Sequence, residues 1–397
     1  MEDAPTLGEH ISPDRTLLGP GPSDMHPRVY EAMTETIVGY LDDSYVEVMD
    51  DVQDGLRYLF QTDNEHTFAV SGTGSAAMET AFTNLVEPGE TVLVPSNGYF
   101  GERMGQVAER AGGEIVTVDA DWGKPLEPDA VEAAFEKHQP EVFGFVHGET
   151  STGVRQSAIP ELTAIAHDHD AYVVADTVAS LGGVEFRTDE WDLDVVYSGS
   201  QKCLSAPPGV SPITFGDRAV EKIRSREHPV RSWYLDFEGV WEYWQDEPSY
   251  HHTGPVSTTY ALREALRLVA EEGIEARWTR HERVAGALKA GLEAMGVPVA
   301  VADEHWLATL NAVSVPEGVD DGRVIDRLMA DHGIEIVGGL GDLAGDIFRV
   351  GCMGHSARPE KIAGFVVAFG SILEAEGAAV DVEAGAAATA NALADWY

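Results

Sequence analysis

Short apolar, β-rich runs alternate with amphipathic helical patterns between residues 65 and 215. The runs that predict strands are residues 67–70, 91–95, 114–118, 141–146, 171–175, 194–197 and 212–215, and the helical patterns between them include residues 76–86 and 129–138. This alternation is typical of βαβ units, so we expect an α/β fold in which seven strands form a mostly parallel sheet flanked by helices. Ligands of such sheets bind at the carboxyl ends of the strands, so the residues that follow each strand are the first candidates for a site.

A second unit follows the sheet region. A long helical stretch at residues 257–295 leads into predicted strands at 311–315 and 347–350 and helices at 322–332 and 359–374, which is an α+β pattern. We therefore divide the chain into an N-terminal extension (1–24), a large domain (25–270), a smaller C-terminal domain (271–378) and a tail rich in small residues (379–397). We expect this tail to be peripheral or frayed.

The charge of the chain argues against several classes of partner. Asp and Glu number 68 against 26 Lys and Arg, which gives a net charge of −42. Phosphate-rich surfaces would be repelled, so we expect neither nucleic acid nor a membrane as a partner. Disorder is disfavoured because 44% of the residues are hydrophobic. A folded, halophilic protein, whose self-repulsion is relieved by high salt, is the hypothesis that fits.

Sorting and metal-binding signals are weak. The N-terminus M-E-D-A-P-T lacks the basic region and apolar core of a signal peptide, and no apolar run has membrane-spanning length. Cys203 and Cys352 are too few for a disulfide framework or a cysteine-ligated metal. His147, His251 and His252 occur without an H-E-x-x-H pattern, so we expect no metal. These signals predict a cytoplasmic protein.

The first predicted strand is followed by the stretch V-S-G-T-G-S-A-A at residues 70–77. Gly72 and Gly74 allow a tight turn, and the helix that begins near Ser75 offers free N–H groups to an anion. The hydroxyls of Thr73 and Ser75 are further donors, so the stretch predicts a phosphate cradle. Two alternatives stay open here: a dinucleotide fingerprint G-x-G-x-x-A completed by Ala77, and a capped helix that binds no ligand.

Two later strands in succession end near an acid and an amine. Asp176 closes the run A-Y-V-V-A-D, and Lys202 follows the next strand in Y-S-G-S-Q-K-C-L-S-A-P-P-G. A buried carboxylate needs a partner, and a buried lysine has a lowered pKa and becomes a nucleophile toward carbonyls. The alternatives are an N-cap or ion pair for Asp176 and a surface charge for Lys202, although the chain has only six lysines. With pyridoxal phosphate, a lysine forms the Schiff base and an aspartate holds the pyridine nitrogen protonated.

Five motifs resemble, in family order, those of the alanine–glyoxylate (serine–pyruvate) aminotransferases, which are class V, fold-type I enzymes that use pyridoxal phosphate. The motifs are L-L-G-P-G-P-S at 17–23, S-G-T-G-S at 71–75, D-T-V-A-S-L-G-G at 176–183, S-G-S-Q-K-C-L-S-A-P-P-G at 198–209 and Y-H-H-T at 250–253. The resemblance extends to about residue 373. It implies that Lys202 is the Schiff-base lysine, that Asp176 is the pyridinium partner, that residues 25–270 bind the cofactor, and that the N-terminal extension enters the active-site region.

The resemblance also implies a set of contact residues. The further cofactor contacts would be Thr73, Gly74, Ser75 and Gln201 at the phosphate, Phe100 on the ring face, Thr150 at the phenolic oxygen, and Val178. Gly21 and Arg349 would bind the substrate, and Arg349 would grip its carboxylate through a bidentate fork. Relatives often carry tryptophan in place of Phe100, so stacking is kept here while the indole N–H is lost. Tyr250 and Thr253 would reach the phosphate from the neighbouring subunit, which implies a homodimer with a shared active site.

The expected activity is therefore a transamination in which alanine or serine donates an amino group to glyoxylate or pyruvate. Alternatives within class V are an aspartate- or aminoethylphosphonate-type transaminase and a cysteine desulfurase or kynureninase-like lyase. A desulfurase would need a mobile thiol, whereas Cys352 follows an apolar strand and Cys203 flanks Lys202, so we expect both thiols to be packing residues. A dinucleotide-dependent dehydrogenase would leave Lys202 and Asp176 unexplained.

Overall fold

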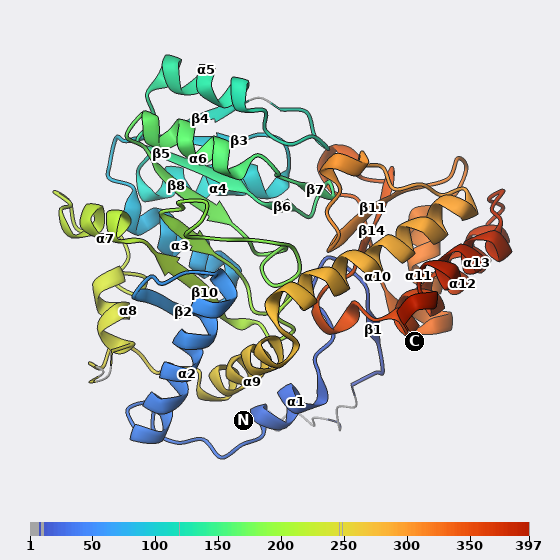
Figure 1. Ribbon diagram of the computed structural model, residues 1–397, viewed down its shortest axis with the longest axis horizontal. Coiled ribbons are helices and arrows are strands. Elements are labelled where there is room, and N and C mark those ends of the chain that lie inside the picture. Colours follow the sequence, from blue (N-terminus) through green and yellow to red (C-terminus); the bar gives the residue numbers. More distant parts are fainter. Residues whose placement is uncertain (1–7, 9–11, 119, 246, 248, 397) are drawn as a thin grey trace, which may run out of the picture.

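The computed structural model describes residues 8, 12–118, 120–245, 247 and 249–396. A seven-stranded sheet in the order β2-β10-β9-β8-β5-β3-β4 forms the centre of the larger unit (Figure 1). Its strands are β2 (His66–Gly72), β3 (Thr91–Pro95), β4 (Glu114–Val118), β5 (Val142–Val146), β8 (Tyr172–Asp176), β9 (Val195–Tyr197) and β10 (Gly209–Phe215). β10 runs antiparallel to β2 and β9, and the other pairs are parallel. The predicted α/β fold and its seven strands are confirmed.

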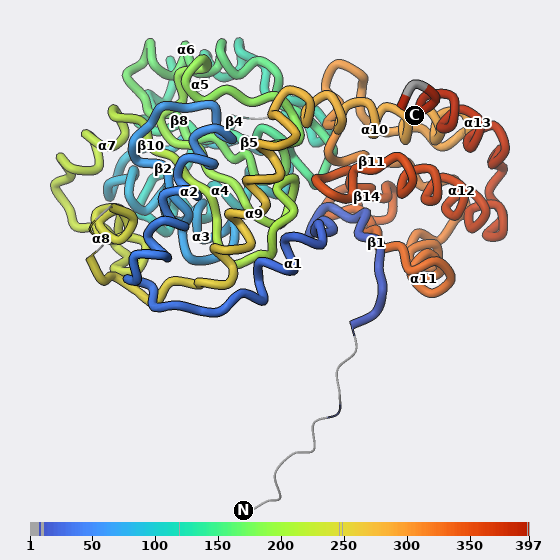
Figure 2. The backbone as a smooth tube through the Cα atoms, turned by 60° about the horizontal axis from the view of Figure 1, so that its bottom comes forward, coloured from blue at the N-terminus to red at the C-terminus, as the bar shows by residue number. Residues whose placement is uncertain are grey.

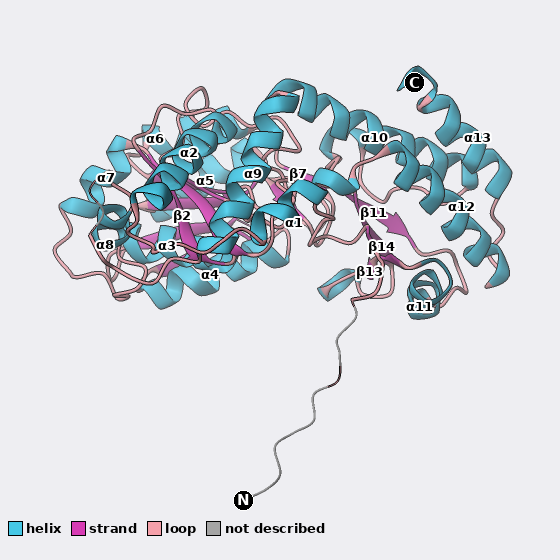
Figure 3. Ribbon diagram, turned by 90° about the horizontal axis from the view of Figure 1, so that it is seen from below, coloured by secondary structure: helices cyan, strands magenta, loops and turns pink. Residues whose placement is uncertain are grey.

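Helices lie on both sides of these strands (Figure 3). They are α2 (Asp43–Phe60), α3 (Gly74–Leu85), α4 (Tyr99–Ala111), α5 (Pro128–His138), α6 (Ile159–Asp168), α7 (Asp217–Arg224), α8 (Phe237–Tyr243) and α9 (Val256–Glu272). The central strands are apolar on both faces, as expected for a covered parallel sheet, and Val173, Val174 and Ala175 of β8 are fully buried. A short hairpin of β6 (Gly148–Glu149) and β7 (Val154–Arg155) follows β5.

The smaller unit is built on an antiparallel sheet in the order β11-β14-β13. Its elements are β11 (Leu310–Ser314), β13 (Val337–Gly338), β14 (Ile347–Gly351), α10 (Ile274–Met295), α11 (Asp321–His332), α12 (Pro359–Ala375) and α13 (Val382–Ala392). Short 3₁₀ turns cover Asp303–His305, Gly341–Leu343, Gly354–Ser356 and Ala394–Trp396. The helical stretch predicted at 257–295 is two helices, because Gly273 has a φ of +82°, which ends α9, and α10 then extends toward the smaller unit (Figure 1).

The N-terminal segment joins the two units. β1 (Thr16–Leu17) pairs in parallel with β12 (Ile334–Glu335) of the smaller unit, and the chain then passes to α1 (Pro27–Met33) beside the larger one (Figure 2). The residues between β1 and α1 bond to both units. Leu18 O accepts from the Gly351 N–H of the smaller unit at 2.7 Å, and the Ser23 N–H donates to Gln201 O of the larger unit at 2.9 Å. Residues 1–7 and 9–11 of the predicted N-terminal extension lie outside the described residues. The boundaries at 24, 270 and 378 stay a prediction.

The C-terminal tail, which was expected to be peripheral or frayed, contains a helix. Residues 382–392 form α13, in which Gly385 and Thr389 are buried against α10. The small residues that suggested fraying instead permit close helix packing, since an ideal Cβ on Gly291 of α10 would lie 2.0 Å from Thr389 Oγ1. The expectation of fraying is therefore wrong for residues 382–392, and the peripheral placement of the tail stays a prediction. In the described part of the chain, no helix combines the length and apolarity needed to cross a bilayer.

A pair of glycine variants tests this packing. Gly291→Ala should lower the free energy of unfolding by about 1–3 kcal/mol, because the added methyl group overlaps α13. Gly286, on the same helix, has no neighbouring atom within 4 Å of an ideal Cβ, so Gly286→Ala should raise stability by up to about 1 kcal/mol through helix propensity. Urea-denaturation midpoints measure both effects, and equal effects of the two variants would contradict the packing of α13 on α10.

Candidate active site

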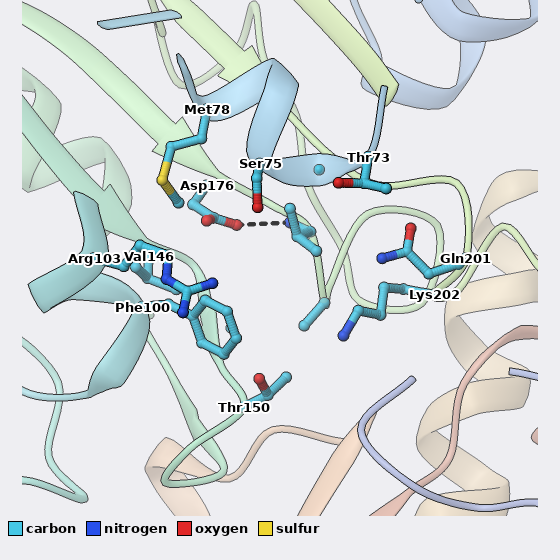
Figure 4. A pocket seen from close by; sticks show the side chains of 14 residues that line it. Thr73, Ser75, Met78, Phe100, Arg103, Val146, Thr150, Asp176, Gln201 and Lys202 are labelled. Carbon is cyan, nitrogen blue, oxygen red and sulfur yellow. Dashed lines mark hydrogen bonds between the residues drawn. The ribbon is translucent and has the colours of Figure 1, made fainter. Parts of the chain in front are cut away.

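One pocket gathers most of the predicted cofactor residues at the carboxyl ends of the parallel strands (Figure 4). The predicted residues that line it are Thr73, Gly74, Ser75, Phe100, Thr150, Asp176, Val178, Gln201 and Lys202. Residues that line it and were not predicted include Met78 and Arg103. The structure thus brings together residues that are up to 129 positions apart, because each follows a strand that ends at the same edge.

The turn between β2 and α3 forms one end of the pocket. An ideal Cβ on Gly72 would lie 2.5 Å from Ala76 Cβ, so the chain can enter the helix this tightly only with glycine. The first N–H groups of α3 have no partner within the helix, and the Thr73 side chain makes no capping hydrogen bond to a described residue. Gln201 Oε1 is buried without a hydrogen-bond partner among the described residues. The free N–H groups of α3 fit a bound phosphate, whereas the Gln201 oxygen is an acceptor, so this side chain could reach the phosphate only through its amide nitrogen.

Asp176 lies at the end of β8 and is 3% exposed. Its carboxylate accepts hydrogen bonds from the Val178 N–H at 2.8 Å, drawn as a dashed line in Figure 4, and from Tyr197 Oη at 2.9 Å. Burial raises the pKa of Asp176 to about 6, although both hydrogen bonds oppose the rise. Sequence reasoning missed Tyr197, yet the strand register could have found it, since parallel pairing sets Tyr197 directly beside Asp176.

Lys202 reaches the pocket from the loop after β9. Its Nζ donates to Pro20 O at 2.5 Å, and burial lowers the pKa of the amine below its ordinary value. Gly21 lies against the same side chain, because an ideal Cβ there would be 2.5 Å from Lys202 Cδ and 2.8 Å from Nζ. The structure therefore places Gly21 beside the lysine, and its predicted contact with substrate stays a prediction.

Arg349 on β14 approaches the pocket from the smaller unit. The guanidinium Nε donates to Gly338 O at 2.8 Å and Nη1 donates to Thr150 O at 3.3 Å, which fixes the plane of the fork. Burial lowers the pKa of Arg349 below its usual range. The two bonds leave further N–H groups for a carboxylate, as the prediction requires.

Tyr250 and Thr253 do not line this pocket within one chain. Both are exposed, and Tyr250 retains 60% of its accessible surface beside Tyr40 at a ring-centroid distance of 5.5 Å. Their predicted contact with the phosphate therefore requires a second subunit. That role stays a prediction.

A buried carboxylate close to the pocket was also missed. Glu149, at the end of β6, is 1% exposed and receives hydrogen bonds from the backbone of Phe100 and from Ser151. The sequence offered one signal, since an ionised side chain inside the run F-V-H-G-E-T needs compensating donors.

The remaining candidates have structural surroundings. Cys203 and Cys352 are both buried, which confirms their predicted packing role, and burial raises the pKa of each thiol to about 12. His147 shares a hydrogen bond with Ser180 at 2.8 Å, and His251 shares one with His252 at 2.9 Å. Among the described residues, no group of three or more His, Cys, Asp or Glu side chains is arranged to hold a metal.

Known proteins resemble this chain in sequence and in fold. The family model described as aminotransferase class-V matches residues 21–342. Alanine–glyoxylate aminotransferase of Drosophila melanogaster is 40% identical over 88% of this chain and 90% of its own length. The solved alanine–glyoxylate aminotransferase from Nostoc sp. has a TM-score of 0.91 at 44% identity, covering 93% of this chain and 97% of that one. Ureidoglycine–glyoxylate aminotransferase from Bacillus subtilis has a TM-score of 0.95 at 35% identity, covering 98% and 100%.

These matches exclude one of the alternatives that the glycine-rich turn left open. A dinucleotide-dependent dehydrogenase is excluded, and the fold is that of the fold-type I enzymes, as predicted. The chain therefore belongs to the class-V aminotransferases, and it is a transaminase whose cofactor is pyridoxal 5'-phosphate.

Proposed function

We propose that this enzyme transfers the amino group of a small amino acid, alanine or serine, to a small 2-oxo acid, glyoxylate or pyruvate. The observation that carries the proposal is that Asp176 and Lys202 line one pocket and that Arg349 donates to the backbone oxygen of Thr150 in its wall. The relatives of this chain at 35–44% identity take their names from glyoxylate as acceptor. The acceptor has the broader support, because the donors in those names differ.

The pocket residues fit pyridoxal phosphate. The free N–H groups of α3 suit the phosphate, Gln201 lines the same pocket with an amide nitrogen that can donate, and the Phe100 ring suits the face of the pyridine. When bound, this cofactor supplies an aldehyde that takes up the amino group and a ring that accepts the electron pair of the substrate Cα. Lys202 is the residue that would bind the aldehyde carbon covalently.

The protein groups then have separate tasks. Arg349 binds the substrate carboxylate through its remaining N–H groups, which orients the Cα–H bond toward Lys202. Lys202 would be the general base that removes the Cα proton, and burial, which lowers the pKa of its amine, favours the neutral form that this role needs. Asp176 would hold a proton at the pyridine nitrogen, and its hydrogen bond from Tyr197 fixes the orientation of the carboxylate.

A matrix of donors and acceptors tests the substrate proposal. Alanine, serine, aspartate, (S)-ureidoglycine and cysteine are each incubated with glyoxylate, pyruvate or 2-oxoglutarate, and the amino-acid product is quantified. The expected result is the highest kcat/KM for alanine or serine with glyoxylate or pyruvate. Preference for aspartate or ureidoglycine, or sulfide release from cysteine without transfer, would contradict the proposed substrates.

Replacing Gly21 tests the contact between the N-terminal segment and Lys202. Gly21→Ala should lower kcat about 100-fold, because its Cβ overlaps the lysine side chain and displaces the amine from the reacting carbon. The φ of +118° also disfavours alanine at this position. Gly39→Ala is the matched control, since Gly39 is exposed and has no atom within 4 Å of an ideal Cβ. An unchanged kcat in Gly21→Ala would show that the contact has no role in turnover.

We also propose a homodimer in which Tyr250 and Thr253 complete the partner's phosphate site. Exposed aromatic side chains on the large unit support it, with Trp233 at 71% and Tyr250 at 60% of their accessible surface. A Lys202→Ala subunit and a Tyr250→Phe/Thr253→Val subunit should each be impaired as homodimers. Co-expressed, they should recover about a quarter of wild-type activity, because half of the dimers contain one intact site. Absence of recovery would contradict the shared site.

Two further proposals concern the salt concentration and the compartment in which the enzyme works. The net charge of −42 supports adaptation to high salt, and a higher thermal midpoint in molar KCl than in dilute buffer is expected. Equal thermal midpoints would contradict this adaptation.

The two free thiols are compatible with a cytoplasmic location.

A further inference from the structure

Glu149 is a buried carboxylate whose pKa is raised by burial, and the hydrogen bonds that it accepts from Ser151, Phe100 and Gly101 oppose that rise. Its Oε2 accepts from the backbone N–H of Phe100 at 3.0 Å and of Gly101 at 3.4 Å. Its Oε1 accepts from Ser151 twice, from the backbone N–H at 2.9 Å and from Oγ at 2.6 Å. Both carboxylate oxygens are thereby occupied, as a side chain with 1% exposure requires.

These bonds cap the N-terminus of α4. The N-cap residue Gly98 has no side chain, so the first N–H groups of the helix need acceptors from elsewhere. Glu149 takes those of Phe100 and Gly101, and Ser151 Oγ accepts the N–H of Tyr99 at 3.0 Å. A negative charge at a helix N-terminus is also favoured by the helix dipole. Glu149 therefore fixes the turn of α4 that carries Phe100 into the pocket.

The same side chain fixes the opposite wall. Thr150 directly follows Glu149, lines the pocket, and accepts a hydrogen bond from Arg349 through its backbone oxygen at 3.3 Å. The charge of Glu149 also favours the protonated form of Arg349, against the effect of burial on that pKa. One carboxylate thus joins the first turn of α4 to the strand end where Arg349 is held.

Gly98 leaves the space that this side chain occupies. An ideal Cβ on Gly98 would lie 2.4 Å from Glu149 Cγ and 2.5 Å from Cδ. The backbone of Gly98 is extended, with a φ of 176°, so any residue could adopt it and only the Glu149 side chain excludes alanine.

We infer that Glu149 is a positioning residue that ties Phe100 to Arg349, so that cofactor affinity and the KM for the amino donor depend on one carboxylate. The inference rests on the proposed function, in which Phe100 stacks on the cofactor ring and Arg349 binds the substrate carboxylate. Loss of Phe100 alone should affect chiefly the cofactor, and loss of Arg349 alone chiefly the donor. Loss of Glu149 affects both.

Glu149→Gln tests the inference, because the amide keeps the shape and cannot accept from all four donors. We expect the Kd for pyridoxal phosphate, titrated into the apoenzyme by fluorescence quenching, to rise about tenfold or more. The donor KM should rise in parallel, and the visible circular dichroism of the bound cofactor should change because the ring tilts. Glu102→Gln removes an exposed carboxylate from the same turn of α4 and should leave all three unchanged.

Gly98→Ala provides an independent variant in which the carboxylate is displaced and chemically intact. It should reproduce the changes in Kd, KM and circular dichroism. If Glu149→Gln does not fold, Gly98→Ala and the milder Ser151→Ala, which removes one donor and the acceptor for Tyr99, decide the question by the same readouts. Wild-type Kd, KM and circular dichroism in the folded variants, with only a lower melting temperature, would overturn the inference. A wild-type protein that binds no pyridoxal phosphate would instead overturn the proposed function.

Discussion

Lys202→Ala is expected to lower kcat for amino transfer by at least about 10⁴-fold, because the variant loses both the covalent attachment point and the general base. Lys202 is the one lysine that lines the pocket in the described part of the chain, so no other amine can take over its proton transfer. Arginine should not restore activity either, since a guanidinium stays protonated and forms no such bond to an aldehyde. Steady-state kinetics with a saturating donor and acceptor measure the effect.

Lys137→Ala is the matched control for this experiment. Lys137 is an exposed lysine in the last turn of α5 that does not line the pocket, and its loss should leave kcat unchanged. Lys202→Ala should still bind pyridoxal phosphate, because the residues proposed to hold the phosphate and the ring are unchanged. A Lys202→Ala variant that kept a tenth of wild-type kcat would contradict the assigned role.

Asp176→Asn is expected to lower kcat by about 10²–10⁴-fold, because a neutral amide no longer stabilises a proton on the pyridine nitrogen. The same change should not destabilise the apoenzyme at pH 8. Folding raises the pKa of Asp176 from 3.8 to about 6, so the folded state holds its proton more tightly and ionisation above pH 6 costs stability, which the amide avoids. Kinetics and thermal unfolding of the apoenzyme measure the two effects.

Tyr197→Phe separates the charge of Asp176 from its orientation. The phenylalanine removes one hydrogen bond to the carboxylate and keeps its charge, so a loss of about tenfold in kcat is expected. If Tyr197→Phe were as damaging as Asp176→Asn, orientation would outweigh charge. If Asp176→Asn retained wild-type kcat, the carboxylate would have no role at the ring nitrogen.

Much of the fold was predictable because it rests on local pattern. The strands at 91–95 and 114–118 were predicted to the residue, since apolar runs bounded by polar turns define them. The meeting of Asp176 and Lys202 was also predictable, because they follow two successive strands, β8 and β9, and parallel strands end at one edge of the sheet. The pair is a topological consequence of two neighbouring strands.

The rest depends on contacts between distant segments, which leave no periodic signal. The capping of α4 by Glu149 joins two loops that are 49 positions apart, and the contact of Pro20 with Lys202 spans 182 positions. Gly291 packs against Thr389, which lies in the helix of the C-terminal tail and is 98 positions away. In each case one residue of the pair was visible in the sequence, but nothing in the sequence indicated which distant residue it would contact.

The central claim is that Lys202 binds pyridoxal phosphate covalently in this pocket. The most direct measurement is the absorbance spectrum of the purified protein, followed by borohydride reduction and peptide mass spectrometry. We expect a band near about 410–430 nm that borohydride abolishes, with the reduced cofactor found on the peptide that contains Lys202 and no such adduct in Lys202→Ala. A protein that takes up no pyridoxal phosphate, or a reduced adduct on another lysine, would contradict the account.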